Sequence, residues 1–217
     1  MTDPRRHFDL SLYLVLGADD VGDRDLVEVA AAAVRGGVTL VQFREKRAPS
    51  DATIERARRL KKALAALGVP LIVNDHLEVA LAVDAEGLHL GQDDMDAAAA
   101  RAALGPRRIL GLSAGDADEA SRVDPAVADY AGIGPAYATG SKADAGAAIG
   151  LEGIADLRAR LSLPLVAIGG IASGRVTPVM ARGVQGVAVV SAICAAADPE
   201  AAARTLRREV EAAKVVA

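Results

Sequence analysis

The sequence predicts an α/β protein that folds as a single (β/α)8 TIM barrel over residues 1–217. Short β-rich runs alternate with longer segments of helical periodicity about eight times, and each repeat of about 27 residues has room for one strand, one helix and two short loops. The β-rich runs are nearly continuous in apolar residues, as expected of parallel strands covered on both faces. A doubly wound open sheet has the same local pattern and is the alternative architecture.

The strands and helices are expected in alternating order. The expected strands are Leu12–Leu16, Thr39–Phe43, Leu71–Val73, Gly87–Leu90, Ile109–Leu112, Tyr130–Ile133, Leu165–Ile168 and Gly186–Val190. The expected helices are Asp25–Arg35, Asp51–Leu67, His76–Val83, Asp96–Leu104, Ala117–Val123, Leu151–Leu161, Pro178–Arg182 and Pro199–Val215. Because no linker or low-complexity tract divides them, we expect one domain with residues 1–10 as a short N-terminal extension.

Individual residues mark where several helices begin and end. In the first expected helix, Leu26, Val29 and Ala33 recur three and four residues apart and form one apolar face. Ser50 and Asp96 stand where a helix N-cap is expected. Glycines that are expected to end helices in a left-handed conformation are Gly36, Gly68, Gly105 and Gly183.

The composition excludes several classes of partner. Lys and Arg total 25 against 29 Asp and Glu, so the net charge of −4 gives no general attraction to nucleic acid or anionic lipid. Two Phe, three Tyr and no Trp make base-stacking surfaces improbable. No secretory signal or apolar run of roughly 20 residues is seen, so we expect a cytoplasmic protein without a membrane partner. Cys194 is the single cysteine, which excludes an intrachain disulfide.

Barrel enzymes build their active sites at the C-terminal ends of the strands, and the unusual polar residues of this sequence stand there. After the second expected strand, Gln42, Arg44 and Lys46 alternate along an extended segment and therefore project to one side. Phe43 and Glu45 project to the other side. A guanidinium, an ammonium and an amide together suit a polyanion such as diphosphate. The alternative for this segment is a solvated charge cluster.

Two loops after neighbouring strands supply carboxylates. Asp75 follows the third expected strand, and Asp93 and Asp94 follow the fourth. Carboxylates from the two loops can meet at one hard cation, and Mg2+ is typically held by one or two carboxylates together with substrate phosphate oxygens and water. The spacing does not separate Asp93 from Asp94. A helix N-cap is the alternative role for Asp75.

Histidines close to these loops are candidate ligands as well. His76 and His89 lie next to the two carboxylate segments. Isolated histidines more often make hydrogen bonds in the core than bind metal. We therefore expect both histidines to make hydrogen bonds in the core.

A second anion site is expected after the last two strands. Gly169-Gly170 and Val190-Ser191 lie where barrels commonly bind a monophosphate through backbone N–H groups and a short helix. Plain turn glycines are the alternative. Between the two anion sites in chain order lies the glycine-rich segment 132–142, whose Lys142 is a candidate to neutralise a leaving diphosphate. A flexible loop with a solvated lysine is the alternative for this segment. Two anion sites imply two phosphorylated substrates.

These segments together resemble one family, the thiamine-phosphate synthases. The motifs that carry the resemblance are Gln42-Phe43-Arg44-Glu45-Lys46, Asn74-Asp75, Gly87-Leu88-His89-Leu90-Gly91-Gln92-Asp93-Asp94, Gly111-Leu112-Ser113, Asp129-Tyr130-Ala131-Gly132-Ile133-Gly134-Pro135, Thr139-Gly140-Ser141-Lys142 and Ala167-Ile168-Gly169-Gly170-Ile171. They occur in the family's order from about Leu12 to Ala195. The ordered set is far more specific than any one motif.

The resemblance implies a transferase of thiamine biosynthesis. It would condense 4-amino-2-methyl-5-hydroxymethylpyrimidine diphosphate with a thiazole monophosphate, and release thiamine phosphate and diphosphate. Diphosphate can leave first, because the ring amino group stabilises the carbocation that the thiazole nitrogen then captures. Such a step needs mainly neutralisation of charge on the leaving group, with Mg2+ as the cofactor. The implied partners are these small molecules, and a homo-oligomer is compatible with the sequence.

The resemblance also assigns roles by position. Expected to bind the pyrimidine diphosphate are Gln42, Phe43, Arg44, Glu45, Lys46, Asn74, Ser113 and Lys142. Expected to hold the thiazole phosphate are Thr139, Gly140, Ser141, Gly170, Val190 and Ser191. Asp75 and Asp94 are the expected Mg2+ ligands, and the expected catalytic residues are Arg44, Lys46, Ser113 and Lys142.

The sequence departs from the family pattern at a few positions. Gly140 replaces a proline common between the two hydroxyl residues, and Ala114-Gly115 follow Ser113 where polar residues are usual. A thiazole tautomerase on the same barrel is the alternative function, although it has no need of a full diphosphate and Mg2+ set. A sugar-phosphate epimerase and a non-catalytic thiamine-phosphate sensor are further alternatives.

Overall fold

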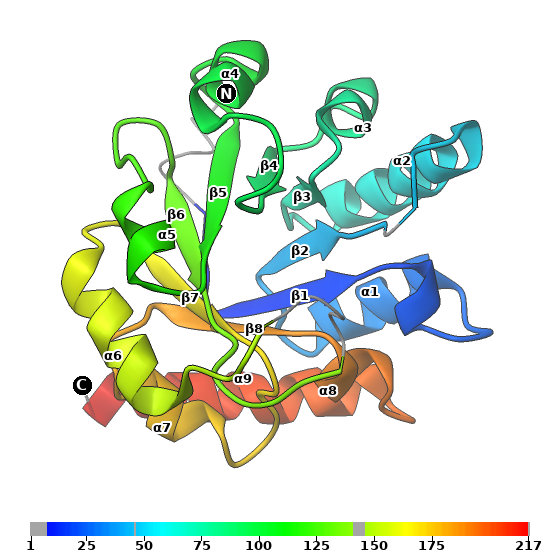
Figure 1. Ribbon diagram of the computed structural model, residues 1–217. Coiled ribbons are helices and arrows are strands. Elements are labelled where there is room, and N and C mark those ends of the chain that lie inside the picture. The colour runs from blue at the N-terminus through cyan, green and yellow to red at the C-terminus, as the bar shows by residue number, and fades with distance from the viewer. Residues whose placement is uncertain (1–7, 46, 141–145, 217) are drawn as a thin grey trace.

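The computed structural model of the protein describes residues 8–45, 47–140 and 146–216, and it contains a closed barrel of eight parallel strands (Figure 1). The strands follow one another around the barrel in chain order. Strand β1 (Leu12–Leu16) closes the barrel by pairing with β8 (Gly186–Val189), with Leu12 opposite Val187. This closure confirms the predicted barrel and excludes the open sheet.

The other strands are β2 (Leu40–Phe43), β3 (Leu71–Asn74), β4 (Gly87–Leu90), β5 (Ile109–Ala114), β6 (Tyr130–Ile133) and β7 (Leu165–Ile168). The helices around them (Figure 1) are α1 (Leu26–Arg35), α2 (Asp51–Ala66), α3 (Leu77–Ala82), α4 (Ala97–Leu104), α5 (Ala117–Ser121), α6 (Gly150–Arg160), α7 (Val176–Met180), α8 (Ser191–Cys194) and α9 (Pro199–Val216). A short 3-10 helix, η2 (Ala18–Asp20), follows β1. Each predicted element is present within about two residues of its expected bounds, whereas η2 and α8 were not predicted. Across the described ranges, we find no helix with the length and apolar character to span a membrane.

Side chains on each strand alternate between the inside of the barrel and the layer under the helices. On β1, Tyr13 and Val15 point into the barrel, whereas Leu12 and Leu14 pack toward the helices. Both sides are buried, which explains why the strand sequences are apolar throughout. The buried apolar residues inside the barrel are Leu10, Tyr13, Val15, Leu40, Ile72, Ile109, Tyr130, Val166 and Ala188.

Helix N-caps follow the local sequence. Ser50 accepts a hydrogen bond from the backbone N–H of Thr53, and Asp96 accepts one from Ala99. Both predicted N-caps are therefore confirmed. Asp25, which was expected inside the first helix, is instead its N-cap.

The glycines that follow the helices were predicted correctly in three of four cases. Gly68, Gly105 and Gly183 have φ of 71°, 78° and 85°. Gly36 does not adopt the left-handed conformation, because its φ is −76°. The positive φ of 112° falls one residue later, at Gly37.

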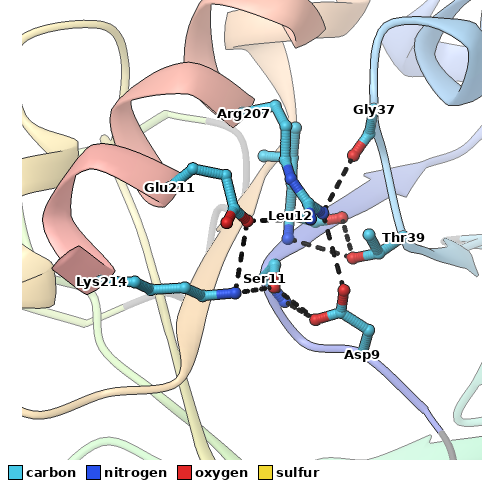
Figure 2. Close-up of polar contacts among 8 residues, drawn as sticks. All are labelled: Asp9, Ser11, Leu12, Gly37, Thr39, Arg207, Glu211 and Lys214. Carbon is cyan, nitrogen blue, oxygen red and sulfur yellow. Dashed lines mark hydrogen bonds and ion pairs between the residues drawn. The ribbon is translucent and has the colours of Figure 1, made fainter.

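The last helix is fastened to the segment that leads into β1 (Figure 2). Arg207 Nη1 lies 3.6 Å from Asp9 Oδ2, and Arg207 Nη2 lies 2.8 Å from Glu211 Oε1. Lys214 donates a hydrogen bond to the Ser11 hydroxyl, which donates to Asp9. These contacts hold α9 against the N-terminal end of the barrel, away from the loops that follow the strands.

Glycines on the strands make room for large side chains inside the barrel. A Cβ atom on Gly111 of β5 would lie 2.2 Å from Cζ and 2.4 Å from Oη of Tyr130 on β6. Tyr130 is 0% exposed, so its ring has nowhere to go without displacing neighbouring side chains. Gly111 and Tyr130 therefore fill the interior as a pair.

We expect Gly111→Ala to lower the melting temperature, because overpacking a filled interior costs about 1–3 kcal/mol. For a chain of this size, each kcal/mol corresponds to about 2–4 °C in Tm. Thermal unfolding followed by circular dichroism measures the effect. Gly140→Ala is the control, since a Cβ there meets nothing within 4 Å. Equal melting temperatures for the two variants would contradict the steric explanation.

Candidate active site

A cavity of about 560 Å³ opens at the C-terminal end of the barrel. All eight strands contribute inward-facing residues or following loops to its walls. The predicted site residues that line it are Gln42, Arg44, Asn74, Ser113, Thr139, Gly170, Val190 and Ser191. The residues expected at the diphosphate and those expected at the monophosphate thus share one cavity.

The remaining predicted residues lie elsewhere or are not placed. Lys46, Ser141 and Lys142 lie outside the described residues. Gly140 is exposed and is not among the residues on the cavity wall. Neither Asp75 nor Asp94 is a wall residue, although their neighbours Asn74 and Asp93 are.

The end of β2 confirms the predicted alternation of side chains. Gln42 and Arg44 face the cavity. Phe43 is 1% exposed in the layer under the helices, and Glu45 Oε2 accepts a hydrogen bond of 3.0 Å from Arg56 of α2. The side chains of Phe43 and Glu45 therefore do not line the cavity, and the expectation that these two residues bind substrate stays a prediction. The strand pleat turns them toward α2.

Asp75 and Asp94 bring two carboxyl groups into contact at the edge of this cavity. A hydrogen bond joins the two side chains, and Asp94 Oδ2 also accepts one of 2.6 Å from the backbone N–H of Gly91. Burial, followed by the hydrogen bond and negative charge of Asp94, raises the pKa of Asp75 to about 7, and the positive charges of His76 and Arg44 oppose the rise. The geometry pairs Asp94, rather than Asp93, with Asp75.

Asp75 does not cap the helix that follows it. The N-cap of α3 is His76, which makes no side-chain capping bond. Asp75 instead has a φ of 61°, a left-handed conformation that Asp tolerates better than most residues. The N-cap alternative for Asp75 is therefore wrong, and its backbone turns the carboxyl group toward Asp94.

This pair makes an incomplete metal site by itself. In the described parts of the chain, no group of three or more His, Cys, Asp and Glu side chains is arranged to hold a metal ion. Two carboxylates suit a hard cation that takes its remaining ligands from phosphate oxygens and water. His89 makes hydrogen bonds inside the barrel, as predicted, and His76 lies 3.8 Å from Glu78.

A row of hydrogen bonds crosses the inside of the barrel, and four of its five residues line the cavity, namely Tyr13, Gln42, His89 and Ser113. Gln42 Nε2 donates to Tyr13 Oη at 2.8 Å, and Tyr13 Oη lies 2.9 Å from Tyr130 Oη. Tyr130 Oη lies 2.8 Å from His89 Nδ1, and His89 Nε2 lies 3.0 Å from Ser113 Oγ. We call these five residues the interior relay. Sequence reasoning missed Tyr13 and Tyr130, although their hydroxyls at inward-facing positions of apolar strands were an available signal.

Burial keeps the relay tyrosines protonated. Desolvation is the main cause that raises the pKa of Tyr13 and of Tyr130 well above the usual value for a phenol. Both side chains are at most 1% exposed. Each therefore has one proton to donate within the relay at neutral pH.

The loops after β6 and β7 are held together beside the cavity. Backbone hydrogen bonds join Ala136 N to Ile168 O at 2.8 Å and Tyr137 N to Gly169 O at 3.0 Å. Gly170 has a φ of 61°, and a Cβ there would lie 2.7 Å from Ala138 O. Only glycine fits this close approach of the two loops.

One arginine supports the same loop. Arg175 Nη1 donates to Gly170 O at 2.8 Å, and its guanidinium carbon lies 4.7 Å from the centre of the Tyr137 ring. Arg175 thereby ties Gly170 to the loop after β6. Ser191, at the start of α8, lines the same cavity.

Comparison with known proteins agrees with this arrangement. The family model described as thiamine monophosphate synthase matches residues 12–193. A thiamine-phosphate synthase of Xanthobacter autotrophicus is 55% identical over 95% of this chain and 98% of its own length, and one of Azorhizobium caulinodans is 52% identical over the same shares. The structure of a thiamine phosphate pyrophosphorylase from Pyrococcus furiosus is similar to this one, with a TM-score of 0.85 and 35% identity over 94% of this chain and 96% of that one.

The comparisons give no support to the tautomerase, epimerase or sensor alternatives. The matched region reaches from β1 into α8 and includes every loop that lines the cavity. The protein therefore belongs to the thiamine monophosphate synthase family.

Proposed function

We propose that this protein is a transferase that forms thiamine phosphate by Mg2+-assisted, dissociative displacement of diphosphate. The pyrimidine diphosphate would lose diphosphate, and the nitrogen of the thiazole monophosphate would capture the pyrimidine methylene cation. Relatives that match over nearly their whole length support the overall reaction. The observation that carries the proposal is one cavity lined both by Arg44 and by Gly170 and Ser191.

The residues near β2, β3 and β5 suit the diphosphate. Arg44 offers a fork of N–H donors, and Asn74 and Ser113 add neutral donors on the same wall. Negative charge grows on the departing diphosphate, and donors fixed in a half-buried site stabilise it without reorganising. The further assignment of Lys46 and Lys142 to this group depends on the sequence motifs alone.

The carboxyl pair fits Mg2+. Two carboxyl groups in contact, one with its pKa raised to about 7, are unfavourable neighbours without a cation between them. Asp75 and Asp94 would hold the ion, and diphosphate oxygens and water would complete its ligands. When bound, Mg2+ would neutralise charge on the diphosphate.

The residues near β7 and β8 suit the thiazole monophosphate. Gly170 brings its backbone close to the cavity, and Ser191 adds a hydroxyl at the start of α8. Backbone N–H groups of such loops bind phosphate in many barrels. The chain then has to position two ligands and requires no nucleophile of its own, since the thiazole nitrogen forms the new bond.

The reaction itself can be tested by omission. We expect thiamine phosphate and diphosphate in equal amounts when the pyrimidine diphosphate, the thiazole monophosphate and Mg2+ are all present. Leaving out either substrate or chelating Mg2+ should abolish thiamine phosphate. Liquid chromatography and a diphosphate assay follow both products. Isomerised thiazole without thiamine phosphate would contradict the proposal.

We expect Arg44→Ala to lower kcat by about 10²–10³-fold, because it removes a donor to the leaving diphosphate. Steady-state kinetics with both substrates measures the effect. Arg47→Ala is the matched control, since Arg47 is 80% exposed and 3.6 Å from Asp19. The role given to Arg44 is wrong if both variants keep wild-type turnover.

We expect Asp94→Asn to reduce turnover by orders of magnitude and to weaken the pH dependence of stability. Between its usual pKa of 3.8 and about 7, Asp75 holds a proton in the folded state that the unfolded chain releases, so stability falls as pH rises through this window. Removing the Asp94 charge lowers the pKa of Asp75 and shrinks this fall. Melting temperatures at pH 5 and pH 8, recorded in the presence of a chelator, measure the fall in stability.

The neighbouring Asp93→Asn variant is the control for the change in charge. Asp93 and Asp94 are both exposed, but Asp94 alone of the two is hydrogen-bonded to Asp75. The melting temperatures of wild-type protein and Asp93→Asn should fall by the same amount between pH 5 and pH 8. An equal loss in Asp94→Asn would show that the two carboxyl groups are not coupled.

A further inference from the structure

The interior relay joins two residues of the proposed pyrimidine diphosphate site through three residues to which no role has been assigned so far. Two of these three, Tyr13 and His89, also line the cavity. Gln42 and Ser113 stand at its ends, on β2 and β5. Tyr13, Tyr130 and His89 connect them, and each is at most 7% exposed. Every link lies between 2.8 and 3.0 Å, the range of good hydrogen bonds.

One arrangement of the protons uses every link of the relay in the same direction. Gln42 Nε2 donates to Tyr13, and Tyr13 donates to Tyr130, a contact of 2.9 Å in which either oxygen can be the donor. Tyr130 then donates to His89 Nδ1, in the tautomer that leaves this nitrogen without a proton. A neutral imidazole that accepts at Nδ1 carries its proton at Nε2, which faces Ser113 Oγ.

This direction determines what the two ends present. At Gln42, the amide nitrogen is used inside the barrel, and the amide oxygen is the atom turned away from Tyr13. At Ser113, the hydroxyl oxygen accepts from His89, and the hydroxyl proton is left to be donated. The relay therefore couples a hydrogen-bond acceptor at Gln42 to a donor at Ser113. The opposite direction would reverse both.

We propose that Tyr13, Tyr130 and His89 are positioning residues that orient the Gln42 amide oxygen toward the amino group of the pyrimidine and the Ser113 hydroxyl proton toward the diphosphate. An amino group donates hydrogen bonds and a diphosphate accepts them, so both ends match the substrate in this direction. A 4-oxo pyrimidine would place an acceptor against the acceptor of Gln42. The relay thus selects amino over oxo pyrimidines. This inference rests on the proposed function.

Tyr130→Phe tests the relay, because it removes the middle hydroxyl and retains the ring. We expect the ratio of Kd for the 4-oxo analogue to Kd for the amino substrate to fall about tenfold or more, which corresponds to about 1.4 kcal/mol. Isothermal titration without thiazole monophosphate measures both constants, so the need of the reaction for the ring amino group does not enter the ratio. KM for the thiazole monophosphate should stay as in the wild type. A loss of folded protein would lower the number of binding sites and leave the ratio of the two Kd values unchanged.

Tyr137→Phe is the matched control, since Tyr137 is the one tyrosine outside the relay and should leave the ratio unchanged. If wild-type protein forms no thiamine phosphate from the amino substrate, the proposed function fails. If it does so and Tyr130→Phe keeps the wild-type ratio, the relay proposal alone is overturned.

A measurement on the wild-type protein keeps the test independent of the variant's folding. The sequence has three histidines, so 15N NMR of the imidazole nitrogens can be assigned with a His89→Gln variant. We expect His89 to be neutral at pH 7, with its proton on Nε2. A proton on Nδ1, or on both nitrogens, would overturn the direction of the relay.

Discussion

Closure of the sheet between β1 and β8 is the constraint on which the site depends. Once the barrel is closed, every second side chain of eight strands must enter one interior, and the loop after each strand must surround the same opening. Gln42 and Ser113 therefore approach one cavity from separate strands. Closure also limits the space inside the barrel, because Tyr130 fits there only where its neighbour Gly111 has no side chain.

The polar residues inside the barrel need hydrogen-bond partners, which the apolar residues beside them do not. An apolar side chain needs only volume, whereas a buried hydroxyl or imidazole needs a partner at every polar atom. Tyr13, Tyr130 and His89 meet this demand by bonding to one another and to residues of the cavity wall. A structural requirement of the core and the orientation of the proposed substrate groups are thus satisfied by one set of hydrogen bonds.

The carboxyl pair of Asp75 and Asp94, by contrast, lowers the stability of the folded state. Asp75 has a left-handed backbone that costs about 1 kcal/mol in a residue with a side chain, and its carboxyl group contacts that of Asp94. Neither feature helps the fold. Perturbed carboxylates of this kind cluster at functional sites, and a cation bound between them would relieve the repulsion.

The sequence was sufficient for the barrel, because apolar runs and helical periodicity repeat through the whole chain. It also located the loops that line the cavity, since polar residues directly follow apolar strands. It did not separate Asp93 from Asp94, because adjacent residues in a loop have no periodicity to distinguish them. The structure separates the two residues, because Asp94 and not Asp93 is hydrogen-bonded to Asp75. The family resemblance had also named Asp94.

Other features were not accessible from the sequence. The links of the relay run between residues up to 117 positions apart, and such contacts depend on strand register rather than on local pattern. The left-handed turn at Gly37 was placed one residue early, because two adjacent glycines leave the end of the helix ambiguous. The short helix α8 escaped prediction because four residues are too few to show a period.

The proposed reaction requires one cavity to hold a diphosphate and a monophosphate ligand at the same time. Isothermal titration of Mg2+-diphosphate into protein saturated with the thiazole monophosphate measures this directly. We expect one diphosphate bound per chain, with an affinity equal to or higher than that of the protein alone. Loss of diphosphate binding in proportion to thiazole monophosphate occupancy would mean that the two ligands compete for a single site, and the proposed reaction would then be wrong.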